Sequence, residues 1–144
     1  MDFLKLENQL CFPLYALSRK VTAHYKPLLE ELDLTYPQYL VMLLLWEHQT
    51  LSVKELGDHL MLDSGTLTPL LKRLEQKKIV VRKRSEEDER IVLISLTEEG
   101  KQLQNKAVEV PVKLQCSLNL SDDDITIARS QIIKLLNKIK DTEL

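Results

Sequence analysis

The stretch from Ser52 to Thr97 constrains the fold more than any other part of the chain. Ser52-Val-Lys-Glu55 has the spacing of a capping box, and Asp63-Ser-Gly-Thr66 supplies cap candidates for a second short helix. Two β-forming runs follow at 79–84 and 91–96, separated by a polar, acidic turn, and together they predict a hairpin. Two short helices and a basic hairpin form the sequence pattern of a winged helix-turn-helix. This pattern predicts a protein that binds duplex DNA.

The charge is unevenly distributed along the chain. The whole protein of 144 residues has a net charge of −2, which gives no electrostatic reason to expect nucleic-acid binding. Between Ser64 and Arg84, however, there are seven Lys and Arg residues and only one Glu, which gives a local charge of +6. A basic segment on a slightly acidic protein concentrates positive potential on one face, and such a face suits phosphate groups.

Helical patterns flank this region on both sides. Apolar residues recur every three or four positions before residue 30 and predict a long helix that begins near Cys11–Phe12 or bends at Pro13. A helix at about 37–48 is apolar nearly all round, as in a buried core. After the hairpin we expect a helix from Thr97 to about Ser117, and then a last helix that Ser121 caps.

The expected fold is mainly α with a small β-hairpin wing, in a single structural domain. Residues 37–97 form the winged helix-turn-helix region, and residues 1–36 and 98–144 supply dimerisation helices. The head is too small to cover both terminal apolar stripes, so packing across a two-fold homodimer is favoured over packing back onto the head. Two heads about 34 Å apart would meet successive major grooves of a palindromic site.

Several residues are candidates for DNA contact. In the second short helix the leucines point inward, and Pro69 favours a helix start nearer Gly65. In the wing, Arg90 at the tip is suited to a minor groove, and Asp88 can pair with it and fix its direction. The remaining candidates for contact with bases or phosphates are Ser64, Thr66, Thr68, Lys72, Arg73, Arg82, Lys83 and Arg84. The alternative is a solvated basic face on an ordinary helical domain, with 86–89 as a polar turn.

Here the chain resembles a known family. Asp88-Glu-Arg90-Ile-Val-Leu-Ile-Ser-Leu96-Thr97 matches the D-x-R-x-x-x-L/I-x-L-T signature of the multiple-antibiotic-resistance regulator (MarR) family of dimeric winged-helix repressors. The stretches 62–73 and 82–90 resemble its organic-hydroperoxide-resistance regulator branch. The resemblance covers essentially the whole chain. It implies that the helix from Ser64 to Arg73 enters the major groove and that Arg90 reaches the minor groove.

Cys11 lies near the expected start of the first long helix. Cysteine reacts as the thiolate, which the amino end of a helix and nearby hydroxyl donors stabilise. Taken alone, a cysteine in an apolar helix is more often a small core residue. The resemblance implies instead a peroxide-reactive Cys11, stabilised by Tyr25 and Tyr36 of the partner subunit, with Tyr15 as a further phenol. Pro13 departs from the branch, in which relatives often carry an aliphatic residue.

Cys116 is the second cysteine. Some members of the branch carry a second cysteine near the end of the fifth helix, and Cys116 falls there. The resemblance thus implies that organic hydroperoxide, or a related oxidant, converts Cys11 to a sulfenic acid. Cys116 of the partner subunit then resolves it as an intersubunit disulfide, and the protein releases DNA. Two alternatives are an incidental thiol at 116 and capping of Cys11 by a small thiol.

Other function classes fit the sequence less well. A thiol peroxidase lacks an Arg or Thr constellation near Cys11, and the three His and two Cys match no metal-ligand spacing, so we expect no enzyme, metal or cofactor. A repressor that responds to a small phenolic ligand instead of thiol oxidation stays open. The apolar run Tyr39–Trp46 is far shorter than the ~20 residues of a membrane span, and the start of the chain lacks a signal-peptide pattern. We therefore expect a soluble cytoplasmic protein.

Overall fold

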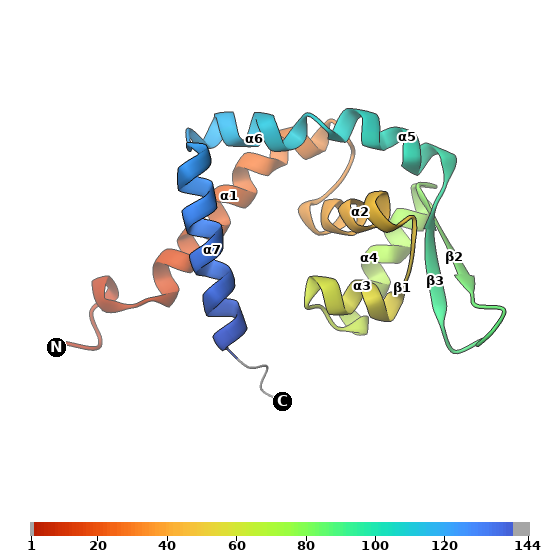
Figure 1. The fold of residues 1–144 in the computed structure, drawn as a ribbon, viewed down its shortest axis with the longest axis horizontal. Helices are drawn as coiled ribbons and strands as arrows, with labels where there is room; N and C mark the ends of the chain where they lie inside the picture. The colour runs from red at the N-terminus through yellow and green to blue at the C-terminus, as the bar shows by residue number, and fades with distance from the viewer. Residues whose placement is uncertain (1, 140–144) are drawn as a thin grey trace.

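The computed structural model describes residues 2–139 (Figure 1). We call residues 36–96 the head, and the helices at 11–30 and 98–138 the arm. Met1 and residues 140–144 of the predicted dimerisation segments lie outside the described residues. A short 3-10 turn, η1 (Leu6–Asn8), precedes the first helix. The other elements, in chain order, are α1 (Cys11–Glu30), α2 (Tyr36–His48), β1 (Thr50–Ser52), α3 (Val53–Leu60), α4 (Ser64–Gln76), β2 (Val80–Arg84), β3 (Val92–Leu96), α5 (Glu98–Ala107), α6 (Val110–Leu118) and α7 (Asp122–Lys138). The predicted fold, mainly α with a small β wing, is confirmed.

Side-chain caps set the starts of the two short helices in the head. The Ser52 hydroxyl accepts from the Glu55 N–H at 3.0 Å, and the Glu55 carboxylate accepts from the Ser52 N–H at 2.7 Å, as the capping box predicts. Asp63 accepts from the Thr66 N–H at 2.7 Å, so α4 begins at Ser64. The expected start nearer Gly65 was therefore wrong.

Pro69 lies inside α4, where proline normally breaks a helix. Its missing N–H leaves only the carbonyl of Gly65 without its helical bond, and Gly65 lies in the exposed first turn, open to water. Three of the four leucines of α4 are buried as expected, since Leu67, Leu71 and Leu74 are each at most 1% exposed, while Leu70 is half-buried. The cap and this buried face outweigh the local penalty of the proline.

The core of the head joins α2, α3, α4 and the sheet. Val41, Met42 and Leu45 of α2 are fully buried against Leu56 of α3 and the leucines of α4. Trp46 closes this core toward α5, because its indole N–H donates to the carbonyl of Gly100 at 2.9 Å. The helix predicted at 37–48 therefore has the buried role that its composition indicates.

The sheet has three antiparallel strands in the order β1-β3-β2. Strands β2 and β3 form the predicted hairpin, with Val80 opposite Leu96. Strand β1 was not predicted, because it contains only three residues and runs directly into the capping box of α3. It pairs with β3 through Leu51 opposite Ile94, and this pairing anchors the wing to the head.

The helix predicted from Thr97 to Ser117 is interrupted. It consists of α5 and α6, which are separated at residues 108–109. Pro111 has no N–H to offer the carbonyl of Ala107, and this explains the break. Asn119 then adopts a left-handed conformation (φ 54°), and the Ser121 capping box starts α7 in a new direction. In Figure 1, α7 turns downward at the end of α6 instead of continuing along it.

The arm leaves much of its apolar surface uncovered. Helix α1 packs against α6, where the His24 ring lies 3.2 Å from the Ser117 hydroxyl. The apolar stripe of α7 contacts solvent, with Ile132, Leu136 and Ile139 exposed to 37%, 47% and 72%. The amino half of α1 is similarly exposed, at Leu10, Phe12, Leu14 and Leu17. Within residues 2–139, no helix is both long and apolar enough to cross a bilayer.

Candidate functional sites

Helix α4 presents a polar face beside its buried leucines. Ser64, Thr66, Lys72 and Arg73 are exposed on this face. Thr68 is half-buried, and its hydroxyl donates to the Ser64 carbonyl at 2.7 Å inside the helix. Four of the five residues predicted on this helix therefore lie free on one surface, while Thr68 is turned toward its own backbone.

The three basic residues of strand β2 differ in their exposure and in their contacts. The Lys83 ammonium lies 3.7 Å from the Glu86 carboxylate and remains 74% exposed. The Arg84 guanidinium donates to the Glu89 carbonyl at 2.8 Å, so it links the end of β2 to the wing turn. Arg82 is half-buried, and its backbone N–H donates to the Glu75 carboxylate of α4 at 3.3 Å. The acidic turn therefore contacts the basic strand, through the Glu86 carboxylate and the Glu89 carbonyl.

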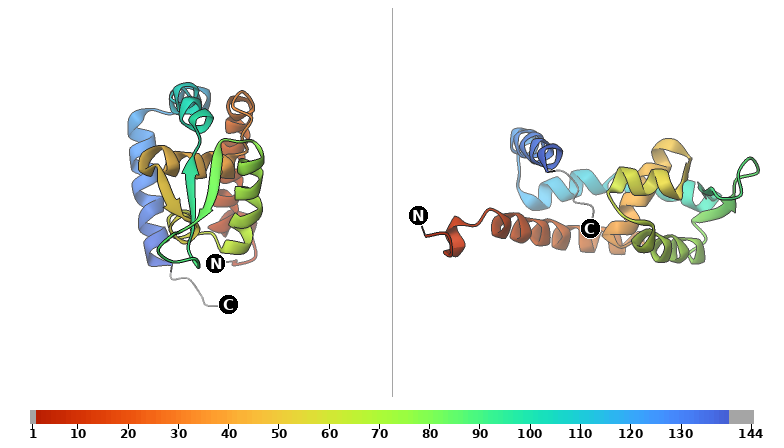
Figure 2. Two further views of the ribbon diagram at one scale, coloured as in Figure 1. Left: turned by 90° about the vertical axis from the view of Figure 1, so that its right-hand side faces the viewer. Right: turned by 90° about the horizontal axis from the view of Figure 1, so that it is seen from below.

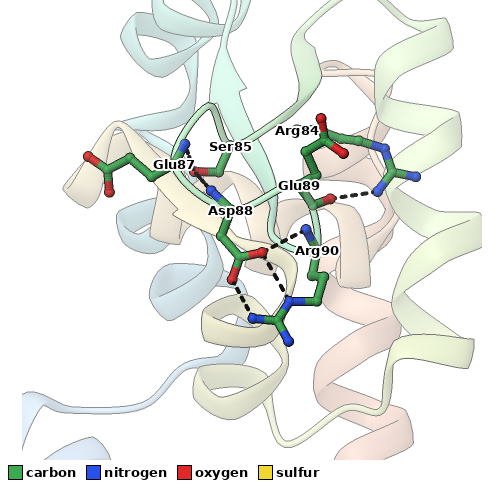
Figure 3. Close-up of polar contacts among 6 residues, drawn as sticks. All are labelled: Arg84, Ser85, Glu87, Asp88, Glu89 and Arg90. Carbon is green, nitrogen blue, oxygen red and sulfur yellow. Dashed lines mark hydrogen bonds and ion pairs between the residues drawn. The ribbon is translucent and has the colours of Figure 1, made fainter.

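The wing tip holds Arg90 in a defined direction (Figure 3). Its Nε and one terminal nitrogen each donate to the Asp88 carboxylate at 3.1 Å, and its backbone N–H donates to the same group at 3.0 Å. Hydrogen bonds from Arg90 hold the pKa of the Asp88 carboxyl below its usual range. The Arg90 side chain is 90% exposed, so the pair aims a charged group at solvent without burying it. The pairing predicted for Asp88 is present.

The amino end of α4 and the tip of the β2–β3 hairpin lie at the same side of the head, the lower side in Figure 1 and in the left view of Figure 2. Helix amino ends carry free N–H groups that favour phosphate. A helix amino end and a hairpin tip that carries the exposed Arg90, both on one side of the head, make a candidate nucleic-acid interface.

The two thiols lie in the arm, and both are exposed. Cys11 is the first residue of α1, so the helix starts where the sequence predicted, with Pro13 in its first turn. Cys116 lies in the last turn of α6, beside Ser117, which contacts His24 of α1. At 1.5 Å per residue, the thirteen positions between Cys11 and His24 span about 20 Å. A disulfide needs Cα atoms less than about 7 Å apart, so this conformation does not permit a bridge within one chain.

Two of the three predicted phenols, Tyr25 and Tyr36, form a cluster at the other end of α1. The rings of Tyr25 and Tyr36 are 4.7 Å apart, and Tyr39, which sequence reasoning did not assign, lies 5.8 Å from Tyr25. Burial, with smaller effects from Tyr36 and Tyr39, raises the pKa of Tyr25 to about 12. Burial also raises the pKa of Tyr36. These phenols therefore remain O–H donors at neutral pH.

Cys11 and Tyr25 stand fourteen positions apart on one helix, about 21 Å along its axis. Tyr25 and Tyr36 instead line a cavity of about 470 Å³ next to the turn between α1 and α2. Tyr15 lies on the exposed surface one turn after Cys11, where the Arg19 guanidinium stacks 5.0 Å from its ring centre. Within one chain, only Tyr15 of the three predicted phenols is therefore near Cys11.

No cluster of metal-ligating side chains occurs among the residues that the structure describes. His48 and His59 stack with ring centres 5.6 Å apart, but no third ligand joins them in that part of the chain.

The chain matches known transcriptional regulators. The family model described as transcriptional regulator SarA/Rot matches residues 23–107, which is more than half of the chain. The organic hydroperoxide resistance transcriptional regulator of Bacillus subtilis (strain 168) is 57% identical over 138 residues, which cover 96% of this chain and 94% of that one. The chain belongs to the SarA/Rot family of MarR-type winged-helix regulators.

Solved structures agree with this assignment. Reduced AbfR bound to DNA, a protein of Staphylococcus epidermidis, is 39% identical with a TM-score of 0.78, over 92% of this chain and 93% of that one. Disulfide-formed AbfR is 37% identical, with a TM-score of 0.67 over 91% and 92%. A mutant MarR from E. coli, complexed with operator DNA, is 28% identical, with a TM-score of 0.80 over 88% and 93%. This MarR-type chain is a transcriptional regulator and not an enzyme.

Proposed function

We propose that this regulator binds a palindromic DNA site as a homodimer and releases it when an organic hydroperoxide oxidises Cys11. One observation carries the proposal: along α1, Cys11 lies about 21 Å from Tyr25 and about 20 Å from His24, which contacts Ser117 next to Cys116. A sensor built from these groups needs a second copy. The relative named for organic hydroperoxide resistance supports the choice of oxidant.

The exposed apolar surface of the arm supports the homodimer. Residues on α1 and α7 that would be buried in a complete core lie open in the single chain. Pairing two arms across a two-fold axis covers both surfaces at once and sets the spacing of the two heads. In the paired arrangement, the amino end of one α1 meets the α6 end of the partner's arm, where Tyr25 and Cys116 lie.

DNA binding is assigned to the lower side of the head. The amino half of α4, with Ser64, Thr66, Lys72 and Arg73, enters the major groove. The exposed Arg90, held by Asp88, reaches the adjacent minor groove. Lys83 adds a phosphate contact, and Arg84 contributes mainly through the shape of the wing.

The redox chemistry has two steps. The Cys11 thiolate attacks one peroxide oxygen, the O–O bond breaks, and the alkoxide leaves as an alcohol after taking a proton, so Cys11 becomes a sulfenic acid. The Cys116 thiolate of the partner subunit then attacks the Cys11 sulfur, the S–O bond breaks as the disulfide forms, and the departing hydroxide takes a proton from solvent to become water. The protonated phenols of Tyr25 and Tyr36 of the partner subunit stabilise the charged forms of Cys11. Their rings provide an apolar surface for the organic group of the hydroperoxide.

Thiol variants test the proposal. Protein treated with cumene hydroperoxide is expected to run as a cross-linked dimer on non-reducing electrophoresis, and mass spectrometry should find a peptide joining Cys11 to Cys116. Cys116→Ser should stop at sulfenic acid or at an adduct with added small thiol, and Cys11→Ser should show neither product. A cross-linked dimer that persists in Cys116→Ser would rule out this pairing.

A second candidate effector is a small phenolic compound in the cavity beside Tyr25 and Tyr36. The volume of the cavity and the two tyrosines in its lining favour this alternative. A regulator of that type keeps full release from DNA in Cys11→Ser, whereas the redox mechanism loses it.

A further inference from the structure

Lys77 differs from the other basic residues near the recognition helix, because its charge is directed into the protein. It is the C-cap residue of α4. Its ammonium group donates to the backbone carbonyl of Asp33 and, at 3.2 Å, to the side-chain oxygen of Gln38. The Asp33 carboxylate lies 3.7 Å away, and Lys77 is 29% exposed. Its charge is therefore used to join α4 to the turn between α1 and α2.

The groups that Lys77 holds are the ones that place Tyr36. Gln38 is 3% exposed, and its side-chain oxygen also accepts from the Thr35 N–H at 3.0 Å. Thr35 and Gln38 form the capping box of α2, and Tyr36 is the first residue of that helix. Asp33 occupies a left-handed backbone conformation (φ 54°) that fixes the preceding turn. One ammonium group thus joins the end of α4 to the start of α2.

The same residues line one cavity. Tyr25, Tyr36, Thr35, Asp33 and Lys77 all border the 470 Å³ cavity beside the turn. A shift of Tyr36 in this cavity moves the capping box, and the capping box is bonded directly to the ammonium group of Lys77. The leucine packing between α2 and α4 resists changes in separation, while a multidentate polar contact also fixes direction.

We propose that Lys77 is a positioning residue that couples the phenol pocket to recognition helix α4. This inference rests on the proposed redox function and deepens it. When oxidation of the partner's Cys11 displaces Tyr36, the Lys77 bridge transmits the displacement to the end of α4, and the heads lose their register on DNA. Because the residue acts through α2 and does not touch DNA, its loss uncouples the two states while it leaves binding by the reduced form in place.

Lys77→Met is a clean way to cut the bridge. Methionine keeps most of the apolar stem of lysine, and the Gln38 oxygen still accepts from Thr35, so the capping box is not left unsatisfied. The matched control is Lys78→Met, which removes the same charge from the adjacent, exposed position. Lys77→Arg retains charge and donors, and it should preserve the coupling. If the methionine protein does not fold, Lys77→Gln takes its place.

The readout is the ratio of DNA dissociation constants between the oxidised and reduced forms of the full-length protein, at one salt concentration and with oxidation verified by mass spectrometry. We expect a ratio of at least about tenfold in the wild type, in Lys78→Met and in Lys77→Arg, and less than about threefold in Lys77→Met. A wild-type ratio in Lys77→Met, whatever its absolute affinity, overturns the inference, as does a failure of this variant to oxidise. Equal dissociation constants for the oxidised and reduced forms of the wild-type protein would contradict the proposed redox function itself.

Discussion

In the head, the apolar faces of α2, α3 and α4 meet one another inside one chain, and Leu71 and Leu45 are fully buried. In the arm, helices of similar amphipathic pattern leave Ile132, Leu136 and much of α1 open to solvent. Burial of apolar surface is favourable in both regions. In the head the same chain covers that surface, whereas in the arm a second chain covers it in the proposed homodimer. The DNA-binding surface that we propose therefore lies within one chain, while the proposed sensor requires a second copy.

The largest expected effect is a core truncation in the head. Leu71→Ala removes a fully buried side chain from α4 and should lower the free energy of unfolding by about 2–5 kcal/mol. Thermal unfolding at fixed protein concentration measures it. Met61→Ala, at a 69% exposed position of the head, is the control and should change stability by less than about 0.5 kcal/mol. Equal losses in both variants would mean that the head has no independent core.

The second prediction concerns the arm. Ile132→Glu places a charge in the uncovered stripe of α7 and should raise the dimer dissociation constant at least tenfold, which corresponds to about 1.4 kcal/mol. Sedimentation at several concentrations gives the constant, and Lys134→Gln, also exposed on α7, is the control. If the glutamate protein dimerises as tightly as the wild type, the stripe is not the contact between subunits.

The third prediction tests the wing. Arg90→Met should weaken DNA binding by about 1–2 kcal/mol, because it removes the exposed charge assigned to the minor groove. Asp88→Asn keeps Arg90 but removes the charged partner that directs it, so its loss should be smaller. Fluorescence anisotropy with labelled operator DNA measures both, and both proteins should keep the wild-type unfolding temperature. An unchanged affinity in Arg90→Met would remove the wing from the interface.

The smallest effect is expected in the tyrosine cluster at high pH. The pKa of Tyr25 in the folded protein, about 12, lies above its unfolded value of about 10. Its contribution to stability is therefore fully present below pH 10 and is lost as the pH rises through 12. Tyr25→Phe should show a flatter decline of unfolding temperature across this window. Parallel curves for the two proteins would show that burial does not perturb this phenol.

Local signals in the sequence predicted most of the head. Ser52, Glu55 and Asp63 act through contacts three residues away, and the leucines of α4 repeat at helical spacing, so neighbouring residues suffice. The exceptions depend on context. The Asp63 cap and the buried leucine face together stabilise α4 despite Pro69. Strand β1 is too short for a periodic pattern. Pro111 is a local signal for a helix break, because it lacks a backbone N–H, and it explains the break before α6.

The candidate sites were less accessible to sequence reasoning. The Asp88–Arg90 pair is local and was predicted, but Arg84 turns to the Glu89 carbonyl, a contact that charge alone does not indicate. Lys77 belongs to the basic run in the sequence, yet it faces Gln38, which lies 39 positions earlier. Tyr39 joins Tyr25 and Tyr36 through the packing of α2 on α1. Such contacts arise from tertiary packing and leave no local pattern.

The most direct test of the shared-sensor account is the affinity of one preparation for operator DNA, measured reduced and then after full oxidation by cumene hydroperoxide at constant salt. The account predicts at least tenfold weaker binding after oxidation and recovery when a thiol reductant is added. An affinity that stays the same, in protein that mass spectrometry shows to be completely oxidised, would contradict it.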